Sequence, residues 1–181
     1  MTLKAHATVT DAPRFQPQPP DAFLRLELWS SPHKVAARFK ANFGDPLPGA
    51  GRAVSMGALR VIWREPGAWM IRAPRADCEA VRLRLQTVAG PDGAVTDISG
   101  AAVRCALSGA DWRILLTHGG VFDAEAPEFA PGCVAGTVVE HIAVRFDVIA
   151  CDQVDAYVAP SFAEDLFAYW ASVAGDLDVR G

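Results

Sequence analysis

The most specific pattern in the sequence is Tyr157-Val-Ala-Pro-Ser-Phe-Ala-Glu-Asp-Leu-Phe-Ala-Tyr-Trp170. A β-rich run ends at Pro160, and Ser161 stands three residues before Glu164, which is the spacing of a capping box at a helix N-terminus. Apolar residues then recur at helical spacing, at Phe162, Leu166, Trp170 and Val173. The pattern predicts a strand that passes directly into a helix, whose apolar stripe packs on a sheet.

The first half of the chain predicts the element order β-α-β-β-α. Residues 23–29 alternate between apolar and polar, as a half-buried strand does. A helix is expected to start at Ser31-Pro32, because Pro is favoured at the first helical position. The apolar runs 59–64 and 69–72 flank a Pro-Gly turn and predict a hairpin. Asp77 is then expected to cap a second helix.

The second half repeats this order. A strand is expected over residues 102–107, followed by a short helix over 111–117. Long apolar runs between residues 134 and 149 predict further strands, and residues 155–159 predict the strand before the final helix. Two similar halves in sequence order indicate a structural duplication.

The domain organisation follows from length and composition. The 181 residues suit one domain, which we expect over residues 23–175, with similar halves at about 23–90 and 95–175. Residues 1–22 hold four prolines among polar residues and predict an extended arm without regular structure.

Composition and charge exclude several classes of protein. Apolar residues make up 51% and charged residues 21%, which is typical of a globular protein. The net charge of −4 and the lack of a Lys/Arg block argue against nucleic acid. No run approaches the roughly 20 apolar residues of a membrane span, and no signal-peptide core is present. Four widely spaced cysteines suggest reduced thiols rather than a zinc or redox site, so a cytoplasmic protein is expected; they are Cys78, Cys105, Cys133 and Cys151.

No residue of the chain is nominated as catalytic, cofactor-binding or metal-ligating. Gly49-Ala-Gly51 lacks the third glycine and the preceding strand of a dinucleotide fingerprint. Ser161 lacks the Gly-x-Ser-x-Gly elbow of a nucleophile. Asp97 lies between apolar residues, where a general base could be buried, but Ser99-Gly100 after it favours a turn. His118 beside two glycines more simply ends a helix.

Aromatic residues suggest a contact with another protein. Five Trp and nine Phe are numerous for this length, and no cofactor signature accounts for them. We expect an exposed apolar patch that partner chains cover, and the isolated chain is expected to self-associate or to cover the patch with its arm. The residues proposed for this partner interface are Phe15, Phe23, Trp29 and Trp63.

Four segments carry a resemblance to a known family. They are Arg64-Glu-Pro-Gly-Ala-Trp-Met-Ile71, Val95-Thr-Asp-Ile-Ser99, Ala106-Leu-Ser-Gly109 and Ser161-Phe-Ala163. In this order they resemble the gamma subunit of heterotetrameric sarcosine oxidase, over roughly residues 23–173.

The resemblance implies an α+β fold of duplicated β-α-β-β-α units with antiparallel sheets, like the folate-binding domain of the glycine-cleavage aminomethyltransferase. It implies a non-catalytic accessory subunit in a complex that oxidatively demethylates sarcosine to glycine. FAD, FMN, NAD and tetrahydrofolate would belong to larger, flavin-binding partner chains. The alternative is a stand-alone folate-binding or aminomethyltransferase-like protein, for which Asp97 and Glu140 are the available carboxylates.

Overall fold

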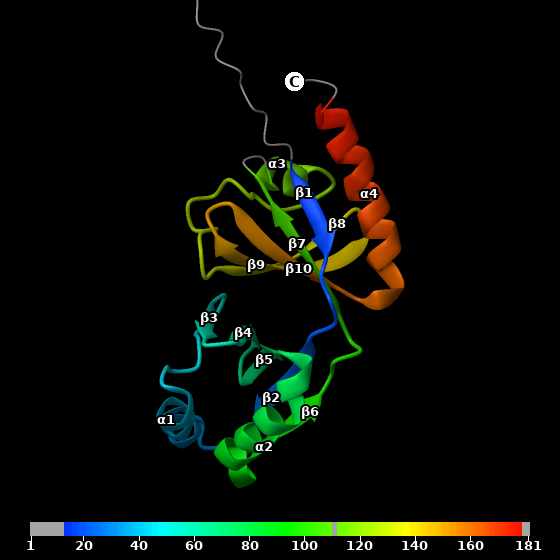
Figure 1. Ribbon diagram of the computed structural model, residues 1–181. Coiled ribbons are helices and arrows are strands. Elements are labelled where there is room, and N and C mark those ends of the chain that lie inside the picture. The colour runs from blue at the N-terminus through cyan, green and yellow to red at the C-terminus, as the bar shows by residue number, and fades with distance from the viewer. Residues whose placement is uncertain (1–12, 110–111, 179–181) are drawn as a thin grey trace, which may run out of the picture.

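The computed structural model describes residues 13–109 and 112–178, which form two five-stranded antiparallel sheets with helices on their outer sides (Figure 1). The first sheet consists of β2 (Ala22–Leu28), β3 (Ala53–Met56), β4 (Leu59–Glu65), β5 (Ala68–Ala73) and β6 (Gly93–Asp97). The second sheet consists of β1 (Arg14–Pro17), β7 (Val103–Ser108), β8 (Val134–Val139), β9 (Ile142–Ala150) and β10 (Gln153–Val158). The helices are α1 (Pro32–Phe43), α2 (Cys78–Ala89), α3 (Trp112–Thr117) and α4 (Pro160–Asp178), with 3-10 turns at Arg75–Asp77 and Gly90–Asp92.

The two sheets are built to one plan, which confirms the expected α+β class. The strand order is β3-β4-β5-β2-β6 in the first sheet and β8-β9-β10-β7-β1 in the second. In both halves the first strand leads to a helix, then to three neighbouring strands, then to a second helix. β1 therefore occupies the position in the second sheet that β6 occupies in the first.

β1 corrects the expectation that residues 1–22 lack regular structure. Arg14–Pro17 pairs antiparallel with β7. The Phe15 ring is half-buried and packs against Phe167 and Trp170 of α4, with ring centroids 6.3 and 6.4 Å apart. The chain then crosses to the first sheet as β2, so this connection links the two halves. Residues 1–12 lie outside the described part.

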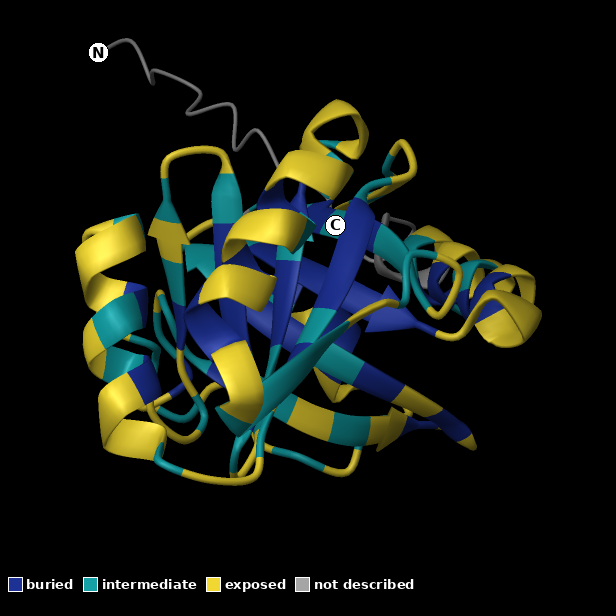
Figure 2. Ribbon diagram, turned by 90° about the horizontal axis from the view of Figure 1, so that it is seen from below, coloured by how far each residue is buried: buried dark blue, intermediate teal, exposed yellow. Residues whose placement is uncertain are grey.

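Each sheet buries one face under its own helices. In the first sheet Leu24 and Leu26 point toward α1 and α2, where they meet Phe39 and Leu85. In the second sheet β7, β9 and β10 pack on α3 and α4 around Trp170. Figure 2 shows buried strands between helices whose outer sides are exposed. None of the helices in the described part of the chain is both long and apolar enough to cross a membrane.

Several local expectations are confirmed and others are wrong. The hairpin of β4 and β5 and all four helices are where the sequence predicts them, although residue 111 lies outside the described part. β3 lies in a stretch rich in Pro and Gly, and neither β3 nor β6 is among the strands predicted from the sequence. α4 starts at Pro160, so Ser161 lies in the first turn and not at the N-cap. Asp77 makes no side-chain capping hydrogen bond, and Phe162 is exposed rather than part of the buried stripe.

Candidate functional site

The inner faces of the two sheets meet along a row of buried and half-buried charges. On β4 and β5, Arg60 lies directly opposite Arg72, and on β9 and β10, Asp147 lies directly opposite Asp155. Like charges opposite each other on neighbouring strands are destabilising. Each arginine instead reaches across to an aspartate of the other sheet, so the two like-charged pairs neutralise each other.

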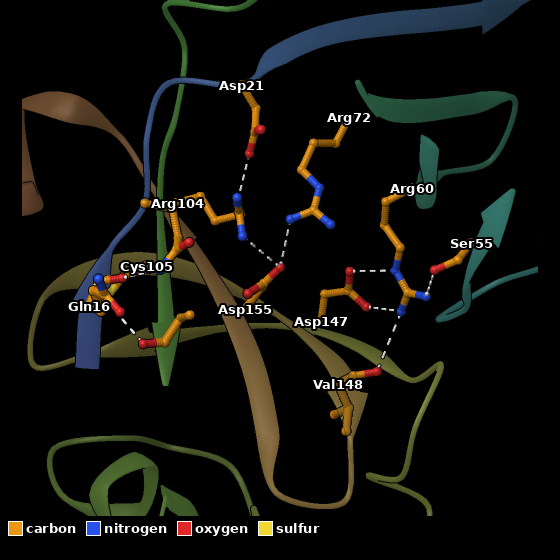
Figure 3. Close-up of polar contacts among 12 residues, drawn as sticks. Gln16, Asp21, Ser55, Arg60, Arg72, Arg104, Cys105, Asp147, Val148 and Asp155 are labelled. Carbon is orange, nitrogen blue, oxygen red and sulfur yellow. Dashed lines mark hydrogen bonds and ion pairs between the residues drawn. The ribbon is translucent and has the colours of Figure 1, made fainter. Parts of the chain in front are cut away.

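The Arg60–Asp147 pair is the most deeply buried of these contacts (Figure 3). Arg60 donates from Nε to Asp147 Oδ2 at 2.9 Å and from Nη2 to Oδ1 at 2.5 Å, and its Nη1 donates to Ser55 Oγ at 3.0 Å. Burial alone would lower the pKa of Arg60, but the hydrogen bond and the charge of Asp147 raise it above its ordinary value. Arg60 therefore stays charged, and its contact with Asp147 is bidentate.

A second group of charges continues the row. Asp155 Oδ2 accepts hydrogen bonds from Arg72 at 2.8 Å and from Arg104 at 3.5 Å, and Arg104 also donates to Asp21 at 2.6 Å. Burial raises the pKa of Asp155, and the two arginines partly offset that shift. Three arginines face three aspartates over the whole row, so the charge balances. The row holds the sheets together and leaves no charge for a ligand.

A cleft of about 470 Å³ opens between the same two sheets, and its positive charges are not balanced. Its charged lining residues are Arg64 of β4 and Arg145 of β9. Arg64 Nη1 lies 3.9 Å from the sulfur of Met70, and Arg145 Nη1 lies 3.5 Å from the backbone oxygen of Trp63. Among residues 13–109 and 112–178, no carboxylate forms an ion pair with either arginine. Burial lowers the pKa of Arg145, the like charge of Arg64 lowers it further, and the charge of Glu65 offsets part of the shift.

Tyr157 forms the wall between the cleft and the charged row. Its ring packs edge-to-face on Phe23, with centroids 5.9 Å apart, and it lines the cleft. Its hydroxyl is buried and has no hydrogen-bond partner in the described structure. Burial raises the pKa of Tyr157, and the charges of Asp147 and Asp155 raise it further, so the phenol is neutral.

Comparison with known proteins identifies the family. Residues 30–176 match the model of the "Sarcosine oxidase, gamma subunit family". The chain belongs to this family. No protein among the curated sequences matches the chain.

Two solved structures share the fold of this gamma-family chain. Heterotetrameric sarcosine oxidase from Corynebacterium sp. U-96, in complex with pyrrole 2-carboxylate, matches with a TM-score of 0.81 at 20% identity, over 92% of this chain and 86% of that chain. Glycine cleavage system aminomethyltransferase T from Bartonella henselae matches with a TM-score of 0.64 at 15% identity, over 88% of this chain and 45% of that chain. The folate-binding-domain-like fold class expected from the sequence is thereby confirmed.

The structure brings only some of the aromatic residues expected at a partner interface to the surface of the gamma-family chain. Phe23 is 2% exposed and packs on Tyr157 between the sheets, so it is a core residue and not available to a partner. Phe15 and Trp63 are half-buried. Trp29 is 65% exposed. The interface role of Phe15, Trp29 and Trp63 remains a prediction.

Trp29 is exposed but held in place. Its indole Nε1 donates to Pro91 O at 3.2 Å, and its backbone N–H donates to Asp92 O at 3.1 Å. The Asp92 carboxylate in turn accepts hydrogen bonds from Ser30 at 2.8 Å and Arg38 at 3.0 Å. These bonds lower the pKa of Asp92 and keep it charged. The ring is thus presented to solvent from a rigid support.

The two carboxylates weighed for an aminomethyltransferase-like site do not line the cleft. Asp97 is exposed and accepts hydrogen bonds from the backbone N–H and hydroxyl of Ser99, at 2.9 and 2.5 Å. These bonds lower the pKa of Asp97, so it is a turn residue and a weak base. Glu140 lies in the β8–β9 turn with a φ of 55°, and its N–H donates to Gly119 O.

The charged row and the cleft arginines were not found from the sequence. The available signal was a charged residue within an otherwise apolar strand, as at Arg145 and Asp147 in β9 and at Asp155 in β10. Such a residue must find a partner, but strand pairing alone does not give the partner on the other sheet. Within the described residues, no three His, Cys, Asp or Glu side chains gather as a metal site would require.

Proposed function

We propose that this gamma-family chain is a non-catalytic accessory subunit of a cytoplasmic heterotetrameric sarcosine oxidase. The observation that carries the proposal is the family match over residues 30–176, together with a fold that covers 92% of this chain and 86% of a chain of a heterotetrameric sarcosine oxidase. The larger partner chains would bind FAD, FMN, NAD and tetrahydrofolate. The whole complex would demethylate sarcosine oxidatively to glycine and pass the one-carbon unit to tetrahydrofolate.

The state of the ionisable groups supports an accessory role. The buried aspartates Asp147 and Asp155 are engaged by arginines, and Asp97 is engaged by Ser99. Burial raises the pKa of the Cys105 thiol to about 12, so it stays protonated and unreactive. All four cysteines are free, as is usual for cytoplasmic proteins.

Trp29 is the best-placed anchor for a partner chain. Interfaces concentrate energy in a few aromatic residues, and a side chain that is already held in its bound position loses little entropy on docking. The hydrogen bonds from Trp29 to Pro91 and Asp92 supply that support. Exposed Leu83 on α2 provides a matched apolar control.

Co-expression of the full chain with candidate flavin-bearing chains tests the proposal. We expect the chain to co-purify with them, and we expect the isolated chain to be colourless and to release no hydrogen peroxide with sarcosine. Trp29→Ala should reduce co-purification while its circular dichroism stays that of the wild type, and Leu83→Ala should reduce it less. A stoichiometric flavin spectrum from the isolated chain would contradict the accessory role.

A further inference from the structure

The inner faces of the sheets carry two kinds of arginine, and within the described residues only one kind forms ion pairs with carboxylates. Arg60, Arg72 and Arg104 each meet an aspartate within 3.5 Å. Arg64 and Arg145 lie on β4 and β9, the strands that carry Arg60 and Asp147, but they line an open cleft. A buried or half-buried charge without a partner is costly. In this cleft, therefore, the two arginines have no ion-pair partner among the described residues, unlike the arginines of the charged row.

The shape and lining of the cleft suit a small ligand. Its volume of about 470 Å³ falls in the usual range of ligand sites, roughly 300–1,000 Å³. Apart from the arginines, the walls are mainly small or apolar, including Ala102, Val138, Ala143 and the Tyr157 ring. Such walls favour an organic body over a bare inorganic ion. The guanidinium groups supply planar sets of donors that match a carboxylate.

We propose that this cleft binds the carboxylate of a small organic anion, with the charge held by Arg64 and Arg145 and the apolar body against Val138 and Ala143. This inference does not rest on the proposed accessory function. The lowered pKa of Arg145 supports it, because an anion would relieve the repulsion from Arg64. The proposal concerns binding, and no chemical step is assigned to the cleft.

Calorimetric titration of the full chain with benzoate at low chloride concentration tests the proposal. Benzoate has nine heavy atoms, so we expect a Kd on the order of millimolar. Benzamide, which has the same ring without the charge, should bind at least about tenfold more weakly, since hydrogen bonds between charged groups are the strong ones. Inorganic phosphate, a charge without the apolar body, should also bind more weakly than benzoate.

Variants locate the binding. Arg145→Gln and Arg64→Gln should each weaken benzoate binding by about tenfold or more. Arg82→Gln removes the same charge from the exposed face of α2, where Arg82 pairs with Glu79, and should leave benzoate binding unchanged. In the absence of anion, Arg145→Gln should have a thermal midpoint equal to or above that of the wild type, because it removes an unbalanced charge.

Four results would overturn the proposal. The first is no benzoate binding at concentrations of tens of millimolar, and the second is equal binding to wild type and both cleft variants. The third is a lower midpoint for Arg145→Gln, which would make Arg145 a satisfied structural residue. The fourth is benzoate binding to the isolated chain that disappears in a complex with partner chains, because an acidic group of a partner would then fill the cleft.

Discussion

Asp147→Asn should be among the most damaging single substitutions in this fold. It leaves a neutral side chain of nearly the same shape opposite Arg60, which is 6% exposed and stays charged. It removes the charge from two hydrogen bonds of 2.9 and 2.5 Å. Breaking a buried ion pair by removing one partner costs about 3–5 kcal/mol, because the other charge is left uncompensated. For a chain of this size each kcal/mol lowers the thermal midpoint by about 2–4 °C, so a loss of about 6–20 °C is expected.

Urea unfolding followed by tryptophan fluorescence and by circular dichroism measures this cost. Glu79→Gln is the matched control, because Glu79 and Arg82 form a bidentate pair with similar lengths, 2.8 and 2.7 Å, on the exposed surface of α2. It should leave the midpoint unchanged, since solvent screens such pairs. The double variant Arg60→Met, Asp147→Leu should recover most of the stability, because apolar replacement of a buried pair is often neutral. A loss below about 1 kcal/mol for Asp147→Asn would refute the claim that this pair holds the sheets together.

Three further predictions follow from burial. Trp170→Ala should lower the free energy of unfolding by about 3–5 kcal/mol, because a buried ring is lost from the core. Ser161→Ala should lower it by less than about 0.5 kcal/mol, because Ser161 is an exposed residue of the first helical turn. Denaturant unfolding curves of the two variants measure both changes. In the native protein a thiol reagent should label exposed Cys151 rapidly and buried Cys105, with its pKa of about 12, only after unfolding, and mass spectrometry of digested samples would reveal any other order. The raised pKa of Asp155 means that the folded state takes up its proton at higher pH than the unfolded chain does, so this group's contribution to stability increases as the pH falls through its folded pKa. The free energy of unfolding of the wild type, measured relative to that of Asp155→Asn, should therefore rise as the pH falls from neutral toward the ordinary aspartate range. A relative fall over the same range would contradict the direction of the pKa shift.

Much of the fold could be predicted because local signals agree with it. The alternation in β2, the Pro-Gly turn between β4 and β5, and the apolar stripe of α4 each act within one element. β3 was missed because its four residues lie among prolines and glycines, and only pairing with β4 defines it. β1 was missed for a similar reason, because its partner β7 is almost ninety residues away along the chain.

The candidate site was harder to predict, because it depends on which residues of two sheets face each other. Arg60 and Asp147 are 87 residues apart in the chain and belong to different sheets. Phe23 was expected at a partner surface as one of the aromatic residues that no cofactor signature accounts for, but its face of β2 is covered by the second sheet. Trp29, which follows β2, is exposed, and its role at a partner interface stays a prediction.

The most direct measurement for the central claim is the native mass of the assembly formed when this chain is co-expressed with flavin-bearing sarcosine oxidase chains. We expect a single complex that contains one equivalent of this chain beside three other kinds of chain, with all flavin retained on the others. Elution of this chain as a separate species, with the flavin-bearing chains fully assembled and active without it, would contradict the account.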